Sequence, residues 1–109
     1  MKPLEGYRVL DLSNVLSGPF CGCQLAHLGA EVIKIEVPNR GDLARQLGLD
    51  VELNQKLMGA TFLAQNSGKR SITINLKSAE GVAVFKRLVK TADVIVENFR
   101  PGVMDRLGV

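Results

Sequence analysis

An amide, an aromatic ring and two guanidinium groups follow one another in the segment Glu97–Gly108. This segment comes directly after the apolar run Val94–Val96, which we expect to form a buried parallel strand. Open α/β sheets bind their ligands outside the carboxyl ends of the strands. The Asn98 amide can exchange hydrogen bonds, the Phe99 ring can stack and the Arg100 guanidinium can pair with phosphate. The segment therefore favours a flat, anionic ligand such as a nucleotide, and a helix N-terminus with ordinary surface charges is the alternative.

The loop Asn14–Pro19 is a second place where an anion could bind. We expect it to lie at the carboxyl end of a strand and to lead into a helix, whose free N–H groups and dipole favour negative charge. Gly18 and Gly22 are four residues apart with Pro19 between them, so the dinucleotide fingerprint G-x-G-x-x-G is absent. This absence weighs against NAD but not against a phosphate placed differently. A plain turn between strand and helix is the alternative.

Charged residues also occur near the ends of two further strands. Glu36 could bind ribose hydroxyls, as an acid does in dinucleotide folds, or it could pair with a basic neighbour. Downstream, Asp42 could cap a turn and Arg45 could reach a phosphate or a carboxylate, or both could belong to a solvated loop. Lys77 follows the third strand and should lie on the same rim, whereas Lys69–Arg70 should lie on the opposite rim. Lys77 is therefore the better phosphate ligand of these basic residues.

Hydrophobic periodicity predicts the elements that would position these groups. The expected strands are Tyr7–Leu12, Glu31–Glu36, Ser71–Leu76 and Asp93–Val96, and the expected helices are Phe20–Leu28 and a Ser78-capped helix that ends near Lys90. Residues 37–67 are predicted to form a long irregular binding loop with one short helix, Leu53–Met58. The pattern as a whole predicts an α/β fold in which right-handed crossovers join parallel strands.

The composition is that of an ordinary globular domain. The 109 residues are 46% hydrophobic and 23% charged, and the net charge of +3 is too small to indicate nucleic-acid binding. Neither a membrane-spanning apolar run nor a signal-peptide core occurs, so we expect a cytoplasmic protein without membrane association. Cys21 and Cys23 should be core thiols on a helix, where they cannot easily bridge. With His27 as the only histidine, we expect no metal site, and no Ser-His-Asp set can be assembled.

The last residues of the chain are more apolar than a domain boundary normally is. Leu107–Val109 includes apolar residues just after a helix should begin, whereas boundaries normally fall in polar linkers. Four parallel strands would also leave exposed sheet edges. We therefore expect either a fragment of a longer protein or a chain that depends on a partner.

Nine segments, taken in order, are shared with one known group of enzymes. They are Pro3–Gly6, Val9–Leu12, Ser17–Pro19, Leu28–Glu36, Gly41–Asp42, Asn66–Ser71, Asn75–Lys77, Glu80–Gly81 and Asp93–Gly102. Through them the chain resembles, over essentially its whole length, the family III CoA-transferases. That group includes formyl-CoA:oxalate CoA-transferase, carnitine CoA-transferase and alpha-methylacyl-CoA racemase.

The resemblance implies a Rossmann-like large domain, of which residues 1–109 would be the amino-terminal, CoA-binding part. Positions that contact CoA in relatives correspond here to Asn14, Leu16, Ser17, Val37, Ile74, Asn75, Lys77, Asn98, Phe99, Arg100, Arg106 and Leu107. Two of these positions depart from the family pattern. Val37 stands where some transferases have an arginine near the adenine, and Arg40 could replace that cation. Leu16 stands where oxalate-using relatives have a glutamine, which argues against assuming oxalate as the acceptor.

The resemblance also implies an enzyme. The intact protein would move CoA from an acyl-CoA donor to a carboxylic acid acceptor through an aspartyl intermediate. The Asp concerned would lie beyond residue 109, so no catalytic residue is expected here and this chain alone would be inactive. CoA would be a substrate rather than a cofactor, and the full-length protein would be an interlocked homodimer. An acyl-CoA racemase of the same family and a non-catalytic nucleotide-binding module are the alternatives.

Overall fold

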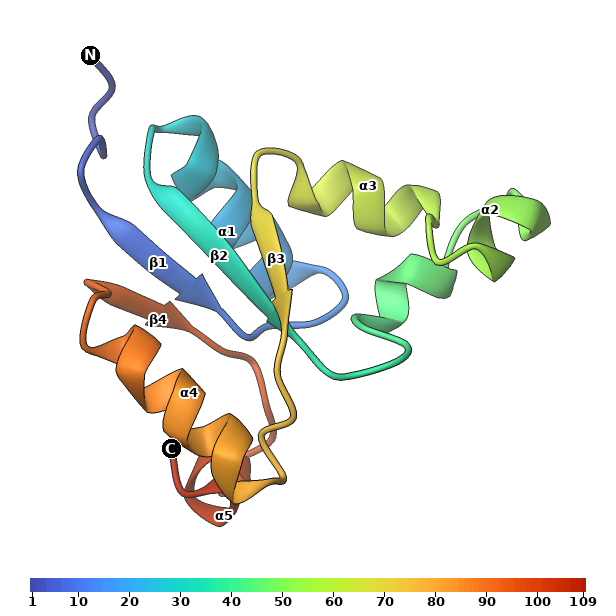
Figure 1. The fold of residues 1–109 in the computed structure, drawn as a ribbon. Helices are drawn as coiled ribbons and strands as arrows, with labels where there is room; N and C mark the ends of the chain where they lie inside the picture. Colours follow the sequence, from blue (N-terminus) through green and yellow to red (C-terminus); the bar gives the residue numbers. More distant parts are fainter.

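A computed structural model describes all residues from 1 to 109, and it contains one sheet of four parallel strands (Figure 1). The strands are β1 (Arg8–Asp11), β2 (Glu31–Glu36), β3 (Arg70–Thr73) and β4 (Val94–Val96), in the spatial order β3-β2-β1-β4. The predicted α/β fold with parallel strands is therefore confirmed. Because every strand points the same way, the loops that follow the four strands emerge at one edge of the sheet, and we call this edge the carboxyl rim.

Five α-helices and one 3-10 helix connect or flank the strands. They are α1 (Ser17–His27), η1 (Leu43–Gln46), α2 (Val51–Gln55), α3 (Ala60–Asn66), α4 (Ala79–Val89) and α5 (Val103–Leu107). Helices α1 and α4 cover opposite faces of the sheet, while α2 projects away from it beyond η1 and α3 (Figure 1). None of these helices combines the length and the apolar composition that a membrane span requires.

The side chains of β2 show how the two faces differ. Ile35 is buried in the cluster that packs against Phe85 of α4, and Ile33 borders the same cluster. On the other face, Val32 packs with residues of α1. Lys34 alternates with Ile33 and Ile35 and so lies on the α1 face with Val32. That face therefore changes from apolar to charged as the strand approaches the carboxyl rim.

Helix α4 forms where the sequence predicts it, because its start and its apolar face are both specified locally. The Ser78 hydroxyl accepts a hydrogen bond from the Gly81 N–H, as an N-cap does. Phe85 is 1% exposed, and Leu88 and Val89 border the same core cluster. The predicted helix is confirmed to within one residue at its end.

Two predicted boundaries are wrong, each for a local reason. The third strand is Arg70–Thr73 rather than 71–76. It ends early because the Asn75 side-chain oxygen accepts a hydrogen bond from the Lys77 N–H, which bends the chain into a turn. Helix α1 begins at Ser17 rather than Phe20. Pro19 lies inside its first turn, where the missing N–H would have no intrahelical partner in any case.

The segment 37–67 is more regular than predicted. Instead of one helix at 53–58 it contains η1, α2 and α3, and α2 spans Val51–Gln55. Asp50 caps α2 by accepting from the Leu53 N–H at 3.1 Å, and Asp42 caps η1 in the same manner through the Ala44 N–H. The predicted short helix overlaps α2 with shifted ends, whereas η1 and α3 are too short for an apolar periodicity to show in the sequence.

Two further predictions about burial are wrong. Strand β4 is parallel as expected, but it is an edge strand, and Val94 and Ile95 are 42% and 41% exposed. Cys23 is buried, whereas Cys21 is exposed on the outer side of α1. Both errors arise because the sequence specifies apolar character but not which surfaces receive a covering layer.

Candidate functional site at the carboxyl rim

The loops after β1 and β4 are joined at the rim by one side chain. The Asn98 Oδ1 atom accepts from the Asn14 N–H at 3.0 Å, and the Asn98 Nδ2 atom donates to the Asn14 carbonyl at 2.9 Å. Both polar atoms of the Asn98 amide are therefore bonded to the first loop. The sequence predicted that Asn98 would bind a ligand directly; in the structure its amide holds the backbone of the loop after β1.

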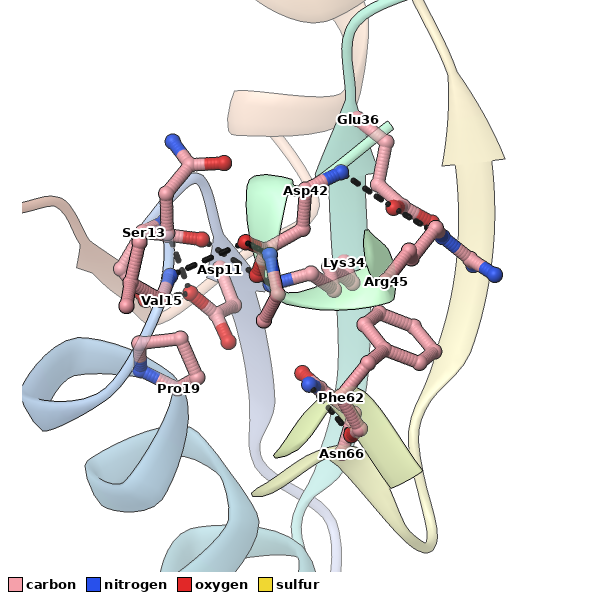
Figure 2. A network of polar contacts seen from close by, with 12 residues as sticks. Asp11, Ser13, Val15, Pro19, Lys34, Glu36, Asp42, Arg45, Phe62 and Asn66 are labelled. Atoms are coloured by element: carbon pink, nitrogen blue, oxygen red, sulfur yellow. Dashed lines mark hydrogen bonds and ion pairs between the residues drawn. The ribbon is translucent and has the colours of Figure 1, made fainter. Parts of the chain in front are cut away.

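A buried ion pair lies beneath the same loop (Figure 2). The Lys34 ammonium lies 2.9 Å from Asp42 Oδ2, in charge contact though not in hydrogen-bond geometry, and both side chains are at most 1% exposed. The same ammonium donates to the Ser13 carbonyl at 2.9 Å. Asp42 Oδ1 accepts from the Val15 N–H at 3.0 Å. The pair thus connects β2 and the segment after it to the loop after β1.

A second buried pair joins the same face of the sheet to α1 and α3. The Lys69 ammonium lies 2.6 Å from Asp11 Oδ2 and also donates to the Pro19 carbonyl and to Asn66 Oδ1. Burial lowers the pKa of Lys69, although its hydrogen bond to Asp11 opposes that shift. The other carboxylate oxygen of Asp11 accepts from the Ser13 N–H and hydroxyl. Lys69 was predicted to lie on the opposite rim, and this is wrong for its ammonium because the long side chain extends along the sheet.

Glu36 ends β2 and pairs with a basic neighbour, which was one of its two predicted roles. Its carboxylate receives two hydrogen bonds of 2.7 Å from Arg45 and one each from the Ser71 hydroxyl and the Asp42 N–H. Burial raises the pKa of Glu36, but these hydrogen bonds outweigh burial and hold it at about 2. The hydrogen bonds that Arg45 donates to Glu36 in turn raise the pKa of Arg45. The Arg45 guanidinium also stacks 3.8 Å from the centre of the Phe62 ring. Both charged groups are therefore already occupied within the chain.

Unpaired cations lie at one end of the rim, between the start of α4 and the end of α5. An open hollow of about 500 Å³ lies there, lined by Lys77, Arg106 and Leu107 together with the apolar side chains of Leu76 and Val82. Neither the Lys77 ammonium nor the Arg106 guanidinium makes an ion pair within the chain. The structure thus brings together three of the predicted site residues around one cavity with free positive charge.

A smaller hollow of about 190 Å³ lies at the other end of the rim, beside β3. It is lined by Val37 and Arg40 together with the paired groups Glu36 and Arg45. Val37 is 48% exposed, and Arg40 makes no ion pair. Arg40 is therefore the free cation in the hollow that Val37 borders.

The remaining predicted site residues fall into an exposed and a buried group. Leu16 is 55% exposed, and Ser17, Asn75 and Arg100 are exposed as well. In contrast, the Ile74 side chain belongs to the core, and Phe99 packs partly against that same core. Phe99 therefore offers less of its ring for stacking than the sequence suggested.

The buried charges form one network that the sequence did not predict. Lys34 and Asp11 lie beside apolar residues in β2 and β1, and a charged side chain that is buried there is almost always paired. That signal could have flagged both residues. It could not have identified their partners, because Asp42 and Lys69 come from distant segments.

Comparison with known proteins identifies the family of this chain. Residues 4–109 match the family described as CoA-transferase family III. The chain belongs to CoA-transferase family III. The predicted resemblance is confirmed, and it extends over nearly the whole chain.

Curated relatives of this family III chain include two transferases. The formyl-CoA:oxalate CoA-transferase of Escherichia coli strain CFT073 is 47% identical over 106 residues, which are 97% of this chain and 25% of that protein. The beta subunit of the succinyl-CoA–L-malate CoA-transferase of Chloroflexus aurantiacus is 42% identical over 107 residues, which are 98% of this chain and 26% of that protein. The chain therefore spans about a quarter of the length of these relatives.

Solved structures agree with the fold. A hypothetical protein from Mycobacterium tuberculosis superposes with a TM-score of 0.87 at 44% identity, over 99% of this chain and 28% of that one. A CAIB/BAIF family protein from Brucella suis superposes with a TM-score of 0.86 at 43% identity, over 99% of this chain and 29% of that one. The fold of this family III chain is therefore shared with these solved structures.

Proposed function

We propose that the carboxyl rim of this chain binds the CoA part of an acyl-CoA. The observation that carries the proposal is the pair of unpaired cations, Lys77 and Arg106, at the edge of one hollow in a family III chain. CoA contains a diphosphate and a further phosphate, so its binding requires positive groups that are not already neutralised. Lys77 and Arg106 meet that requirement, whereas Lys34, Arg45 and Lys69 are paired with carboxylates.

We propose the following groups as the contacts along the rim. They are the loop residues Asn14, Leu16 and Ser17, then Val37, then Ile74, Asn75 and Lys77, and finally Asn98, Phe99, Arg100, Arg106 and Leu107. Within this set, Asn98 acts through the loop it holds, and Ile74 contributes its backbone because its side chain is buried. At Val37, where no cation is present, Arg40 supplies the positive charge for the same hollow.

We further propose that residues 1–109 form the amino-terminal, CoA-binding part of a larger Rossmann-like domain. The whole protein would transfer CoA from an acyl-CoA donor to a carboxylic acid through an aspartyl intermediate on a residue outside this chain, and it would act as a homodimer. Two relatives support this proposal, since their names specify formyl-CoA with oxalate and succinyl-CoA with malate. A racemase of the same family would also take an acyl-CoA, so the binding proposal is common to both reactions.

Titration calorimetry with CoA tests the proposal. We expect binding by the folded chain, and a roughly tenfold weaker Kd for Lys77→Ala and for Arg106→Ala, because each removes a charge-assisted contact with phosphate. Lys86→Ala is the matched control, since Lys86 is an exposed lysine on α4 that borders neither hollow. Affinity should be unchanged in that variant. A folded chain that does not bind CoA, or an equal loss in all three variants, would contradict a specific site at the rim.

A further inference from the structure

Val15 adopts a backbone conformation that its side chain disfavours. Its φ angle is 72°, in the left-handed region, where a β-branched residue is an outlier. Its N–H donates to Asp42 Oδ1 at 3.0 Å, and Asp42 is fully buried (Figure 2). Strained backbone of this kind persists only where surrounding structure determines it, and it concentrates at binding and catalytic sites.

The two residues before Val15 are held just as firmly, each by a different segment. Lys34 of β2 donates to the Ser13 carbonyl, and Asn98 after β4 bonds both backbone groups of Asn14. Three consecutive residues of one loop are therefore fixed by side chains that come from three other parts of the sequence. A connection between a strand and a helix does not need so many restraints merely to turn the chain.

The residues that follow the restrained part are open. Leu16 and Ser17 are exposed, and neither backbone N–H has an acceptor within the chain. Their direction is set by the φ angle at Val15, because a change to the favoured negative φ would swing the start of α1 relative to the rim. The restraints thus fix the direction of the free N–H groups of Leu16 and Ser17 and of the exposed Leu16 side chain.

We propose that Asp42 is a positioning residue for CoA, a conclusion that rests on the function proposed above. Its Oδ1 atom holds Val15 in the left-handed conformation, and this sets the presentation of Leu16 and Ser17 to the bound ligand. The Lys34 ammonium neutralises the buried carboxylate, and the hydrogen bond from the Val15 N–H to Asp42 Oδ1 fixes the backbone of the loop.

Two double variants separate this role from general stability. Lys34→Met with Asp42→Asn removes both buried charges but keeps a side-chain oxygen that can accept from Val15. Lys34→Met with Asp42→Ala removes the charges and the acceptor together. Neither variant leaves an unpaired buried charge, which is the change that most endangers folding. We expect the alanine double variant to bind CoA about tenfold more weakly than the asparagine double variant, at a temperature where melting curves show both to be folded.

A rescue substitution provides a readout that a purely structural role would not move. Val15→Gly in the alanine double variant should recover at least about threefold in affinity, because glycine adopts positive φ without strain. Glu31→Gln is the control, since it removes ion pairs with Arg8 and Arg70 at the amino ends of the strands and should leave CoA affinity unchanged. Equal affinities for the two double variants would overturn the proposal, as would a failure of the glycine rescue.

Hydrogen exchange at the Val15 N–H, followed by NMR, distinguishes a failure of the positioning role of Asp42 from a failure of CoA binding. Protection should be present in the wild type, be retained in the asparagine double variant and be lost in the alanine double variant. If the three proteins show this pattern of protection but the wild type does not bind CoA, the proposed function fails, while the restraint of Val15 by Asp42 stands. If the wild type binds CoA and protection does not depend on Asp42, the positioning role fails and the proposed function stands.

Discussion

The two faces of the sheet are built from the same strands by different interactions. Under α4, Leu10 and Ile35 pack with Phe85 in an apolar cluster. On the opposite face near the rim, Asp11 and Lys34 are equally buried but pair with charged groups from distant segments. Figure 2 shows the second face, where residues of η1 and α3 and the start of α1 lie around the charges.

This difference separates two tasks. Apolar contacts are non-directional and tolerate small changes in shape, so the α4 face contributes stability without fixing the rim. Buried ion pairs contribute little net stability, but removing one partner is strongly unfavourable, and their geometry is specific. In this chain the charged face is the one whose hydrogen bonds reach the rim loops. We infer that the charged face positions the loop after β1 and that the α4 face stabilises the sheet.

The largest expected effect comes from breaking the charged face at its centre. Lys34→Met should lower the free energy of unfolding by about 3–5 kcal/mol, because it leaves the Asp42 carboxylate buried without a cation. Urea unfolding followed by circular dichroism measures this loss. A loss below about 1 kcal/mol would show that water enters the site and that the charged face is not closed.

Acid should weaken the charged face over a defined pH range. The pKa of Glu36 is held at about 2, below its ordinary value of 4.5, so its stabilising contribution is complete above about pH 4.5 and is lost as the pH falls through 2. The contribution amounts to roughly 3 kcal/mol. Urea unfolding of the wild type and of Glu36→Gln from about pH 6 downward measures it, and the difference between the two proteins should shrink with acid. A difference independent of pH would contradict the assigned pairing with Arg45.

At the rim itself, Asn98→Ala should weaken CoA binding by about 1–3 kcal/mol, because it strands two backbone groups of Asn14 and loosens the loop. Titration calorimetry measures the change. Unchanged affinity in this variant would remove Asn98 from the site and would leave the loop to be held by the charged face alone.

The smallest effect should come from the apolar face. Ile35→Val deletes one methylene next to Lys34 in the sequence but on the other face, and it should lower the free energy of unfolding by about 0.5–1.5 kcal/mol. CoA affinity should stay the same, since the rim loops are not restrained from this face. If Ile35→Val weakened CoA binding as much as Asn98→Ala, the division of tasks between the faces would be wrong.

The fold could be predicted from the sequence where the information is local. The alternation in Glu31–Glu36 marked β2 at its observed ends, and the Ser78 cap with the spacing up to Val89 marked α4. Prediction failed for η1 and α3, whose short lengths hide any periodicity. At the rim, Lys77 and Arg106 are predicted from the strands that they follow, whereas the hollow that they share depends on tertiary packing.

The sequence by itself determined the parallel α/β fold and the types of group at the carboxyl rim, because these depend on periodic patterns and on the residues that follow strands. It determined the family through the segments that the chain shares with known transferases. Only the tertiary structure decided which charges are free to bind a ligand. Lys69 and Lys77 are both lysines near β3, yet the first is buried against Asp11 and the second is unpaired. Ion pairing depends on segments that come together only in the folded chain. No local sequence pattern around Lys69 or Lys77 indicates which of them will meet a carboxylate.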